Sequence, residues 1–559
     1  MPGPRFPDDF NLADYFLFDR LKDGLGDKIA IRYGQRTYTY ADVATRSLAV
    51  AEMLSRLCQR GDRVYIVLPD TPPFAWSFFG TLARGAVVTM GNPDSPPEDL
   101  ARIIEYVGAR VVITLPRVAA ALSPLVAHGA PDLESILLVP DTATGGDPEG
   151  PVDGVAPVRS MLVEALTDLA HPERAPHAHR PRIHRDDHAI WLFTSGSTGR
   201  AKAAMHTHRD FAFNTEVYAK ETVCYRAGDV SVSVPRLFFG YATGTNLMFP
   251  FAVGATVGLF SERPTPESLA RAIADYRPSV VTNVPTMMGK LLEHDDALAA
   301  AGKPRLDFSS IRFHLSAGEA LPPALLARFT ERFGNDVYDG IGSAEMFHIY
   351  ASNRPLDTKP GSLGRVVHGY EIRILPEEAD GPGAAPLPPG EIGVMWVKGD
   401  SVALGYHQDR DKSWQTFHGH WCRTGDLFRI DEQGYLWFSG RADELLKVSG
   451  LWVAPLEVEH CLTQHAAVAE AAVIAADDRG LLKPKAFVVL REAARALVGD
   501  AADKRAALGA ELQDHVKAHL SKHKYPRWVI FVDDLPRNDR GKVDRKVLKE
   551  REALGRNPS

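Results

Sequence analysis

The chain has 559 residues, more than one ordinary hydrophobic core accommodates, so two or more domains are expected. A formal net charge of −7, with 45% hydrophobic and 24% charged residues, is typical of a soluble globular protein. The same charge argues against a nucleic-acid-binding protein, which carries a basic surface. The four cysteines have no CxxC spacing, which indicates neither a zinc site nor a disulfide framework and makes a reducing compartment the default.

The amino-terminal segment, MPGPRFPDDF, lacks the apolar core of a signal peptide. No stretch has the roughly 18 uninterrupted apolar residues of a membrane span. We therefore expect a cytoplasmic protein that has no membrane partner. The sequence leaves a monomer and a homodimer both open.

Strand and helix patterns alternate along much of the chain. The segments that read as short strands lie at 37–40, 64–68, 86–89, 111–115, 255–260, 279–282 and 311–315. Helical spacing of apolar residues separates them, for example over 266–276. Such alternation implies βαβ units and a parallel sheet.

An apolar run at 189–193 stops abruptly at a loop of Gly, Ser and Thr, which closes on Lys202. Small residues let backbone N–H groups and hydroxyls approach a polyphosphate closely, and a lysine adds a point charge. A flexible surface turn is the alternative. Because the spacing differs from the GxxxxGK[ST] P-loop, we predict a phosphate-binding loop of another design.

The later part of the chain changes character. Residues 140–188 are rich in Pro, Gly, Asp and His, which we interpret as a solvated connector rather than a metal site. Short hairpin-like strands at 371–375 and 393–397 predict a small β subdomain. We expect an α/β fold: a large N-terminal domain (1–441) with parallel sheets flanked by helices plus that subdomain, and a mobile C-terminal α+β domain (442–559).

Five motifs follow one another in a fixed order. They are the phosphate loop, DGIGSAE at 339–345, RTGD at 423–426, GRAD at 440–443 and PRNDRGK at 536–542. This series resembles the adenylate-forming superfamily of acyl-CoA synthetases, peptide-synthetase adenylation domains and luciferases. Three further segments are most similar to its benzoate–CoA ligase and 2-aminobenzoate (anthranilate)–CoA ligase branch: LFFGYATG at 237–244, HLSAGE at 314–319 and MFHI at 346–349.

The resemblance implies an aryl–CoA ligase that uses ATP, Mg²⁺ and coenzyme A. An aryl carboxylate would attack the α-phosphate of ATP to give an acyl-adenylate and pyrophosphate, and the CoA thiol would then displace AMP. Lys542 would bridge the carboxylate and the α-phosphate, Lys202 would neutralise the leaving pyrophosphate, and Glu345 would hold Mg²⁺. Asp426 would bind the ribose hydroxyls beside Arg441. The other matched ATP- and AMP-binding positions are Thr194, Ser195, Gly196, Ser197, Thr198, Gly199, Ala317, Gly318, Glu319, Asp339 and Gly340.

By the same resemblance, the aryl pocket combines small residues with aromatic and aliphatic ones, which suits a flat ring. Its members are Gly240, Tyr241, Ala317, Gly342, His348 and Ile349. His348 would bind the carboxylate or an ortho substituent, with a structural histidine as the alternative. Ser449 and Gly450 would face the CoA channel, and Asp443 would be the hinge of the mobile domain.

The chain departs from the family pattern at three alanines. Ala201 and Ala203 flank Lys202 where the family has proline and glycine, and Ala344 replaces a threonine whose hydroxyl contact is worth about 1–2 kcal/mol. Two other functions remain open. One is a stand-alone enzyme that loads an aryl acid onto the phosphopantetheine of a carrier protein, and the other is a non-catalytic nucleotide sensor.

Overall fold

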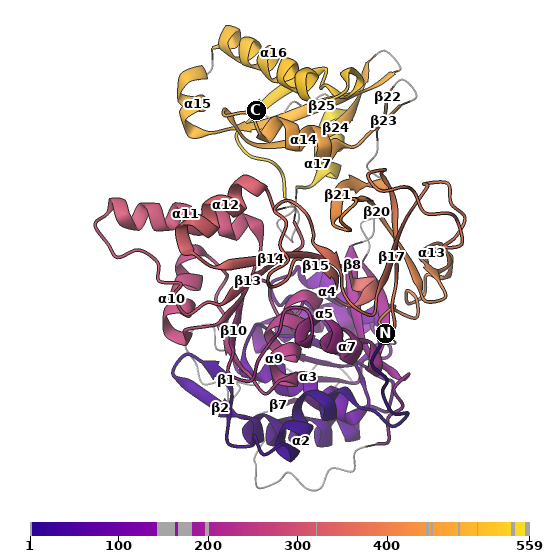
Figure 1. The fold of residues 1–559 in the computed structure, drawn as a ribbon. Helices are drawn as coiled ribbons and strands as arrows, with labels where there is room; N and C mark the ends of the chain where they lie inside the picture. Colours follow the sequence, from indigo (N-terminus) through magenta and orange to yellow (C-terminus); the bar gives the residue numbers. More distant parts are fainter. Residues whose placement is uncertain are drawn as a thin grey trace. The chain divides into compact units, whose positions relative to one another are not determined.

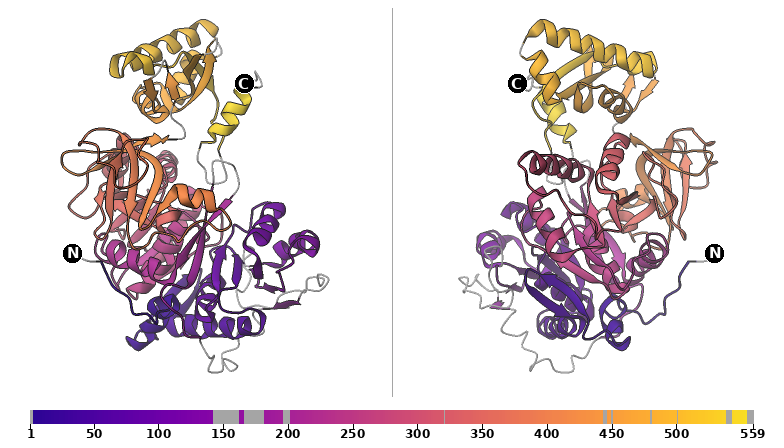
Figure 2. Two further views of the ribbon diagram at one scale, coloured as in Figure 1. Left: turned by 90° about the vertical axis from the view of Figure 1, so that its right-hand side faces the viewer. Right: turned by 60° about the vertical axis from the view of Figure 1, so that its left-hand side comes forward.

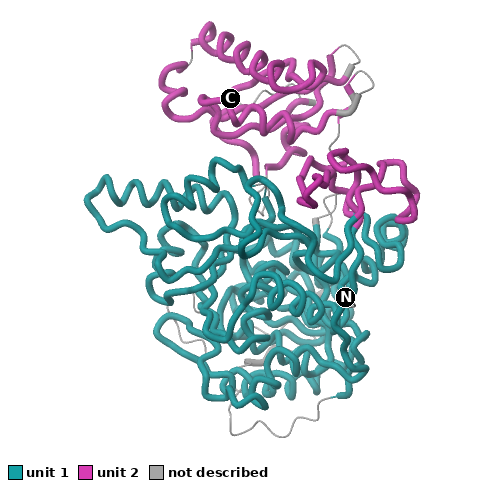
Figure 3. Tube along the Cα trace, viewed as in Figure 1, with its two compact units in different colours: residues 1–372, 397–423 teal, residues 373–396, 424–559 magenta. Residues whose placement is uncertain are grey.

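The computed structural model describes residues 3–141, 162–165, 181–195, 201–319, 321–442, 446–448, 451–478, 481–499, 501–537 and 543–553. The chain divides into two compact units (Figure 3): unit 1 holds residues 1–372 and 397–423, and unit 2 holds residues 373–396 and 424–559. The predicted domain boundary after residue 441 falls inside unit 2 and stays a prediction. No helix in the described ranges has both the length and the apolar character needed to cross a membrane.

Unit 1 contains a seven-stranded sheet in which six neighbouring strands are parallel and β9 is antiparallel to β8. In spatial order its strands are β7 (Leu162–Ala165), β6 (Ser135–Leu138), β5 (Ala109–Thr114), β3 (Arg63–Val67), β4 (Val87–Met90), β8 (His188–Ser195) and β9 (Ala201–Thr207). The predicted strands at 64–68, 86–89 and 111–115 are confirmed as β3, β4 and β5.

A nine-stranded sheet forms the rest of the framework of unit 1 (Figure 1). Its order is β16 (Arg365–Val366), β15 (Ile349–Ser352), β14 (Asp336–Gly342), β13 (Phe313–Ser316), β12 (Val280–Asn283), β10 (Val230–Ser233), β11 (Thr256–Leu259), β1 (Ile29–Tyr33) and β2 (Arg36–Thr39). The strands from β14 to β1 are parallel, and both edges are antiparallel. The predicted parallel α/β architecture is therefore confirmed.

The helices of unit 1 begin and end where their sequences dictate. The longer ones are α2 (Tyr40–Leu57), α3 (Pro72–Arg84), α4 (Pro97–Val107), α5 (Pro116–Gly129), α10 (Pro266–Tyr276), α11 (Pro285–Ala300) and α12 (Pro323–Phe333). Proline opens six of these seven, because its fixed φ suits the first helical turn. The short elements are η1 (Asp14–Phe18), α1 (Asp19–Lys22), α7 (His208–Asn214), η3 (Thr215–Lys220), α8 (Gly240–Thr243), η4 (Gly244–Met248), α9 (Phe249–Ala252), η5 (Ala344–Met346) and α13 (Arg410–Thr416).

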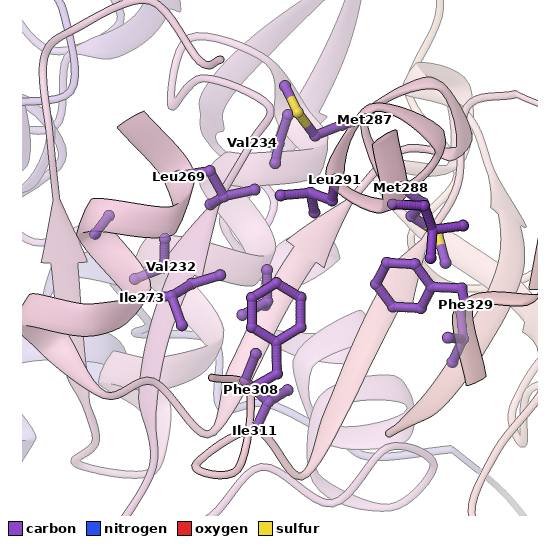
Figure 4. Close-up of a cluster of buried hydrophobic side chains, with 14 of the residues drawn as sticks. Val232, Val234, Leu269, Ile273, Met287, Met288, Leu291, Phe308, Ile311 and Phe329 are labelled. Atoms are coloured by element: carbon purple, nitrogen blue, oxygen red, sulfur yellow. The ribbon is translucent and has the colours of Figure 1, made fainter. Parts of the chain in front are cut away.

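One core cluster of unit 1 lies where α10, α11 and α12 cover the nine-stranded sheet (Figure 4). Val232 and Val281 of the sheet pack against Ile273, Leu291 and Phe329 of the helices, and all five are buried. This packing fixes β12, β13 and β14 as neighbours. The carboxyl ends of these parallel strands consequently open onto one edge of the sheet.

Unit 2 contains a three-stranded sheet of β24 (Val468–Asp478), β25 (Leu481–Leu490) and β26 (Trp528–Val532), in that order. Its other elements are the hairpin β22 (Leu446–Val448) and β23 (Leu451–Val453), with α14 (Pro455–Thr463), α15 (Glu492–Val498), α16 (Ala502–His519), η7 (Lys522–Lys524) and α17 (Arg545–Ala553). Helices α14 and α16 share a core with β24 and β25. Figure 2 shows the ribbon of the chain from two further directions. The predicted α+β character of this region is confirmed.

The small β subdomain is a five-stranded sheet. It is built from β17 (Glu371–Leu375), β18 (Gly393–Lys398), β20 (Trp421–Ile430) and β19 (Phe417–His418), with β21 (Leu436–Arg441) paired to β20. The division between the units cuts through β17, β18 and β20. The predicted hairpin-like strands at 371–375 and 393–397 are thus confirmed.

Candidate active site

The described unit 1 residues predicted to bind nucleotide lie on, or directly after, three strands. Thr194 and Ser195 end β8, Ala317 and Gly318 follow β13, and Asp339 lies within β14. Ligands of open α/β sheets bind outside the carboxyl ends of the strands, so this placement suits a nucleotide. Four of the predicted phosphate-loop residues lie outside the described residues: Gly196, Ser197, Thr198 and Gly199.

Lys202 lies on β9, opposite Thr194 in the β8–β9 ladder. Its Nζ is 3.8 Å from Asp409 Oδ2 and 5.6 Å from the centre of the Tyr406 ring. The Lys202 side chain is 13% exposed. Among the described residues, the ion pair with Asp409 is a long one, and phosphate oxygens could replace that carboxylate.

Glu345 lies in the short helix η5, and Tyr406 donates a hydrogen bond of 2.7 Å to its Oε1. Burial, and next to it the carboxylate of Glu345, raise the pKa of Tyr406 above its usual range, so the phenol remains a donor. Tyr406 thus contacts both Lys202 and Glu345, the residues that the family resemblance associates with pyrophosphate and magnesium. Backbone pairing of residues 404–405 with Met205 of β9 places this tyrosine there.

His206 and Asp210 form a buried pair behind Glu345. His206 Nδ1 lies 3.0 Å from Asp210 Oδ2, and its Nε2 lies 2.6 Å from the carbonyl oxygen of Ala344. Asp210 also closes the capping box of α7 through Thr207, which fixes the carboxylate. The pair therefore anchors the peptide that precedes Glu345.

Tyr406, Asp409, His206 and Asp210 were missed by sequence reasoning. Tyr406, His206 and Asp409 act through contacts with residues far away along the chain, which no local pattern marks. Asp210 lies in a local capping box with Thr207, but that pattern indicates a helix start and not a place in the site. The pairing of residues 404–406 with β9 is a tertiary contact that hydrophobic periodicity does not report.

The predicted aryl residues Tyr241 and His348 lie together in unit 1. His348 Nε2 is 3.0 Å from the carbonyl oxygen of Tyr241, and the two ring centroids are 5.3 Å apart. A Cβ on Gly342 would approach the carbonyl oxygen of His348 to 2.5 Å, so only glycine fits there. A Cβ on Gly240 would meet Leu192 at 2.9 Å, and Ile349 follows His348 as the first residue of β15.

The pocket candidates carry polar atoms that the protein does not satisfy. Within the described residues, Tyr241 Oη and His348 Nδ1 are shielded from solvent and have no hydrogen-bond partner. Burial lowers the pKa of His348 to about 4, so its ring is neutral at pH 7. A buried polar atom without a partner costs about 1–3 kcal/mol, which a ligand with a matching group can recover.

The predicted adenine-binding positions differ from one another in burial, backbone conformation and hydrogen bonding. Ala317 is buried and Gly318 adopts φ +87°, which favours glycine. Glu319 Oε2 accepts hydrogen bonds from the backbone N–H (3.0 Å) and hydroxyl (2.7 Å) of Thr286 at the start of α11, a structural role. Burial raises the pKa of Asp339 to about 8. A Cβ on Gly340, the next residue, would lie 2.9 Å from a backbone oxygen of β15.

Unit 2 carries the predicted ribose-binding pair. Asp426 on β20 and Arg441 on β21 are register partners, and Arg441 Nη1 donates to Asp426 Oδ1 at 2.9 Å. The guanidinium therefore holds the carboxylate that would accept from the ribose hydroxyls. Four predicted residues of this region lie outside the described residues: Asp443, Ser449, Gly450 and Lys542.

Comparison with known proteins shows that this chain is similar to aryl–CoA ligases. Among curated proteins, a benzoate–CoA ligase of Thauera aromatica is 36% identical to this chain, over 98% of the chain and 97% of that protein. An anthranilate–CoA ligase of Pseudomonas aeruginosa is 31% identical, over 94% and 93% respectively.

Two solved structures are similar throughout. An anthranilate CoA ligase in complex with anthranoyl-AMP has a TM-score of 0.84 and 32% identity, and covers 98% of each chain. A benzoate CoA ligase from Burkholderia xenovorans has a TM-score of 0.80 and 34% identity, and covers 96% of this chain and 99% of that one. The family model for AMP-binding enzymes matches residues 18–407, and the model for their C-terminal domain matches residues 457–542. The chain therefore belongs to the AMP-binding enzyme family.

Proposed function

We propose that this protein is an AMP-forming aryl–CoA ligase that acts on a carboxylic acid of the benzoate or 2-aminobenzoate type. The observation that carries the proposal is the contact of Tyr406 with both Glu345 and Lys202, in a chain that matches aryl–CoA ligases over nearly its whole length. ATP, Mg²⁺ and CoA are the expected co-substrates and metal.

In the first step a carboxylate oxygen attacks the α-phosphorus of ATP, the bond to the β-phosphate oxygen breaks, and pyrophosphate leaves. Lys202 supplies positive charge to the leaving phosphates. Glu345 fits a magnesium site because it is a half-buried carboxylate oriented by a hydroxyl donor. Mg²⁺, a hard cation that prefers oxygen ligands, neutralises charge on the phosphoryl oxygens when bound.

The roles of unit 2 remain proposals supported by motif position. Lys542, cationic at pH 7, bridges the incoming carboxylate and the α-phosphate. Asp426, oriented by Arg441, binds the ribose hydroxyls. In the second step the CoA sulfur attacks the acyl carbonyl and AMP leaves, with Ser449 and Gly450 beside the thiol's path. Asp443 is the proposed hinge of a mobile domain that begins at residue 442.

The ring substituent is the finer part of the proposal. Tyr241 Oη and His348 Nδ1 are both buried without a partner among the described residues, which favours an acid whose ring carries an amino or hydroxyl group. Tyr241→Phe should then lower kcat/KM about tenfold for the substituted acid, and much less for unsubstituted benzoate. An equal loss for both acids would leave Tyr241 with a purely structural role.

The deciding experiment measures AMP formation with CoA for a panel of benzoate, amino- and hydroxybenzoates, heteroaryl acids and short aliphatic acids. The proposal expects activity confined to the aryl acids. Activity with a holo carrier protein but not with CoA would favour the carrier-loading alternative. Absence of acid-dependent ATP–pyrophosphate exchange would favour the non-catalytic sensor. We also propose a cytoplasmic location, supported by four cysteines of which none forms a disulfide.

A further inference from the structure

Unit 2 contains a cysteine and two histidines that converge from two helices. Cys461 lies in the last turn of α14, while His515 and His519 lie one turn apart at the end of α16. The thiol sulfur and one ring nitrogen of each histidine all lie within 4.8 Å of one another. The helices pack side by side (Figure 1), and His515 Nε2 donates to the Cys461 carbonyl oxygen at 3.0 Å.

We propose that Cys461, His515 and His519 bind one first-row transition-metal ion, of which Zn²⁺ is the most suitable, in a site separate from that of the magnesium ion. One thiolate and two imidazoles form a borderline-soft donor set that suits zinc and does not suit Mg²⁺ or Ca²⁺. Three protein ligands leave the fourth tetrahedral position to water. Binding replaces the thiol proton, which passes to the solvent.

The hydrogen bonds of the two histidines leave each ring a nitrogen for the metal. His519 Nδ1 bonds to the carbonyl oxygen of His515 at 2.8 Å, and His515 Nε2 bonds to that of Cys461. A carbonyl only accepts, so these nitrogens carry protons, and in the neutral form of each ring the opposite nitrogen carries the lone pair that a metal needs. Ligating histidines in metalloproteins are oriented by the same kind of bond.

Helix electrostatics also favour a cation at this place. Both α14 and α16 end at the cluster, and each carboxyl end carries a partial negative charge of about half an electron. His465, which follows α14, is a supporting residue rather than a ligand. Its Nε2 lies 3.2 Å from Glu511 Oε1, and its Nδ1 accepts from the backbone N–H of Ala467 at 3.3 Å.

The ligands need only a small adjustment to close on an ion. Zn–S and Zn–N bonds of about 2.3 and 2.0–2.1 Å place tetrahedral donor atoms roughly 3.4–3.6 Å apart. Cys461 is 4% exposed and fixed in the core of unit 2, whereas His519 is exposed at the end of its helix. His519, at the exposed end of α16, has the most freedom to adjust. The bound ion ties the end of α14 to the end of α16.

The test uses the full-length protein, stripped of metal with a chelator and kept in excess Mg²⁺ without nucleotide. Co²⁺ is the spectroscopic probe and Zn²⁺ its competitor. We expect one Co²⁺ per chain, with a thiolate-to-cobalt charge-transfer band that Zn²⁺ abolishes, and a higher melting temperature with Zn²⁺. Absence of the band, or of stoichiometric binding, would overturn the proposal.

Variants separate this site from adventitious binding. His519→Ala changes an exposed residue, so the fold should survive, and the affinity for Co²⁺ should fall at least tenfold. Cys461→Ser should remove the charge-transfer band. The matched controls, Cys224→Ser and His368→Ala in unit 1, should change neither the affinity for Co²⁺ nor the charge-transfer band. A band that persists in Cys461→Ser, or an unaltered affinity in His519→Ala, contradicts the assignment.

Discussion

Replacing Tyr406 by phenylalanine removes the hydroxyl that donates to Glu345 Oε1 at 2.7 Å. The ring keeps its place near Lys202 and 5.1 Å from the ring of Phe417. A hydrogen bond to a charged group contributes about 1.5–3 kcal/mol. Because the hydroxyl orients the carboxylate that would hold magnesium, we expect this loss to fall on the affinity for the metal.

Residues that orient metal ligands typically change metal affinity about 10–100-fold when they are mutated. At about 1.4 kcal/mol per factor of ten, that range corresponds to about 1.4–2.8 kcal/mol, which agrees with the hydrogen-bond value. The free Mg²⁺ concentration that gives half-maximal activity of Tyr406→Phe should therefore rise by this factor. The plateau at saturating Mg²⁺ should stay close to that of the parent protein.

Acid-dependent exchange of pyrophosphate into ATP reports the adenylation step alone and is measured against free Mg²⁺ at fixed ATP. The matched control is Tyr33→Phe, which removes a hydroxyl bonded to Ser261 Oγ at 3.0 Å elsewhere in unit 1. The free Mg²⁺ concentration that gives half-maximal exchange should be unchanged in this control. If Tyr406→Phe instead lowered the plateau without moving the midpoint, the hydroxyl would support only the fold and the reasoning would be refuted.

Three further predictions test other parts of the account. Lys542→Ala should lower pyrophosphate exchange about 100- to 1,000-fold, yet the variant should still transfer a supplied acyl-adenylate to CoA. Equal loss in both assays would contradict the assignment of Lys542 to the adenylation step alone. Burial lowers the pKa of His314 to about 3, so protonation of this histidine in the unfolded chain lowers the free energy of unfolding below pH ~6.5, by about 1.4 kcal/mol per pH unit. The urea midpoint of His314→Leu should therefore fall less between pH 7 and pH 5 than that of the parent. An equal fall would contradict the buried neutral state of His314. Gly244→Ala places a Cβ 2.6 Å from the His348 ring and should raise KM for the aryl acid about tenfold or more, whereas Gly289→Ala, whose Cβ meets nothing closer than 4.0 Å, should leave that KM unchanged.

The framework and the motif positions were accessible from the sequence because both are local. Short apolar runs such as 64–68 and 279–282 predicted β3 and β12, and the helix predicted over 266–276 has the bounds of α10. Motif residues such as Asp339 could be assigned because the segments that carry them match the family's motifs in order. Such signals need only a few neighbouring residues.

The contacts that orient the candidate site are not local, and this is why they were missed. Tyr406 reaches Glu345 across 61 positions, and His206 reaches the carbonyl of Ala344 across 138. The cysteine pattern likewise gave no indication of a metal site, because Cys461 and His515 are 54 positions apart. Only the folded chain brings these side chains together, so periodicity and spacing rules cannot find them.

The structure explains how two of the alanines that depart from the family pattern support Lys202. Ala201 and Ala203 belong to strand β9; Ala203 is fully buried, its N–H donates to Tyr106 Oη at 3.3 Å, and its carbonyl accepts from the N–H of His407 at 3.0 Å. Proline could not donate to the ladder, and glycine in a strand costs about 0.5–1 kcal/mol relative to alanine. Lys202 is therefore carried on a regular strand. Ala203→Gly should loosen that support, and we expect a lower melting temperature together with a higher KM for ATP. A higher KM without thermal destabilisation would mean that the alanine acts on the nucleotide directly and not through the strand.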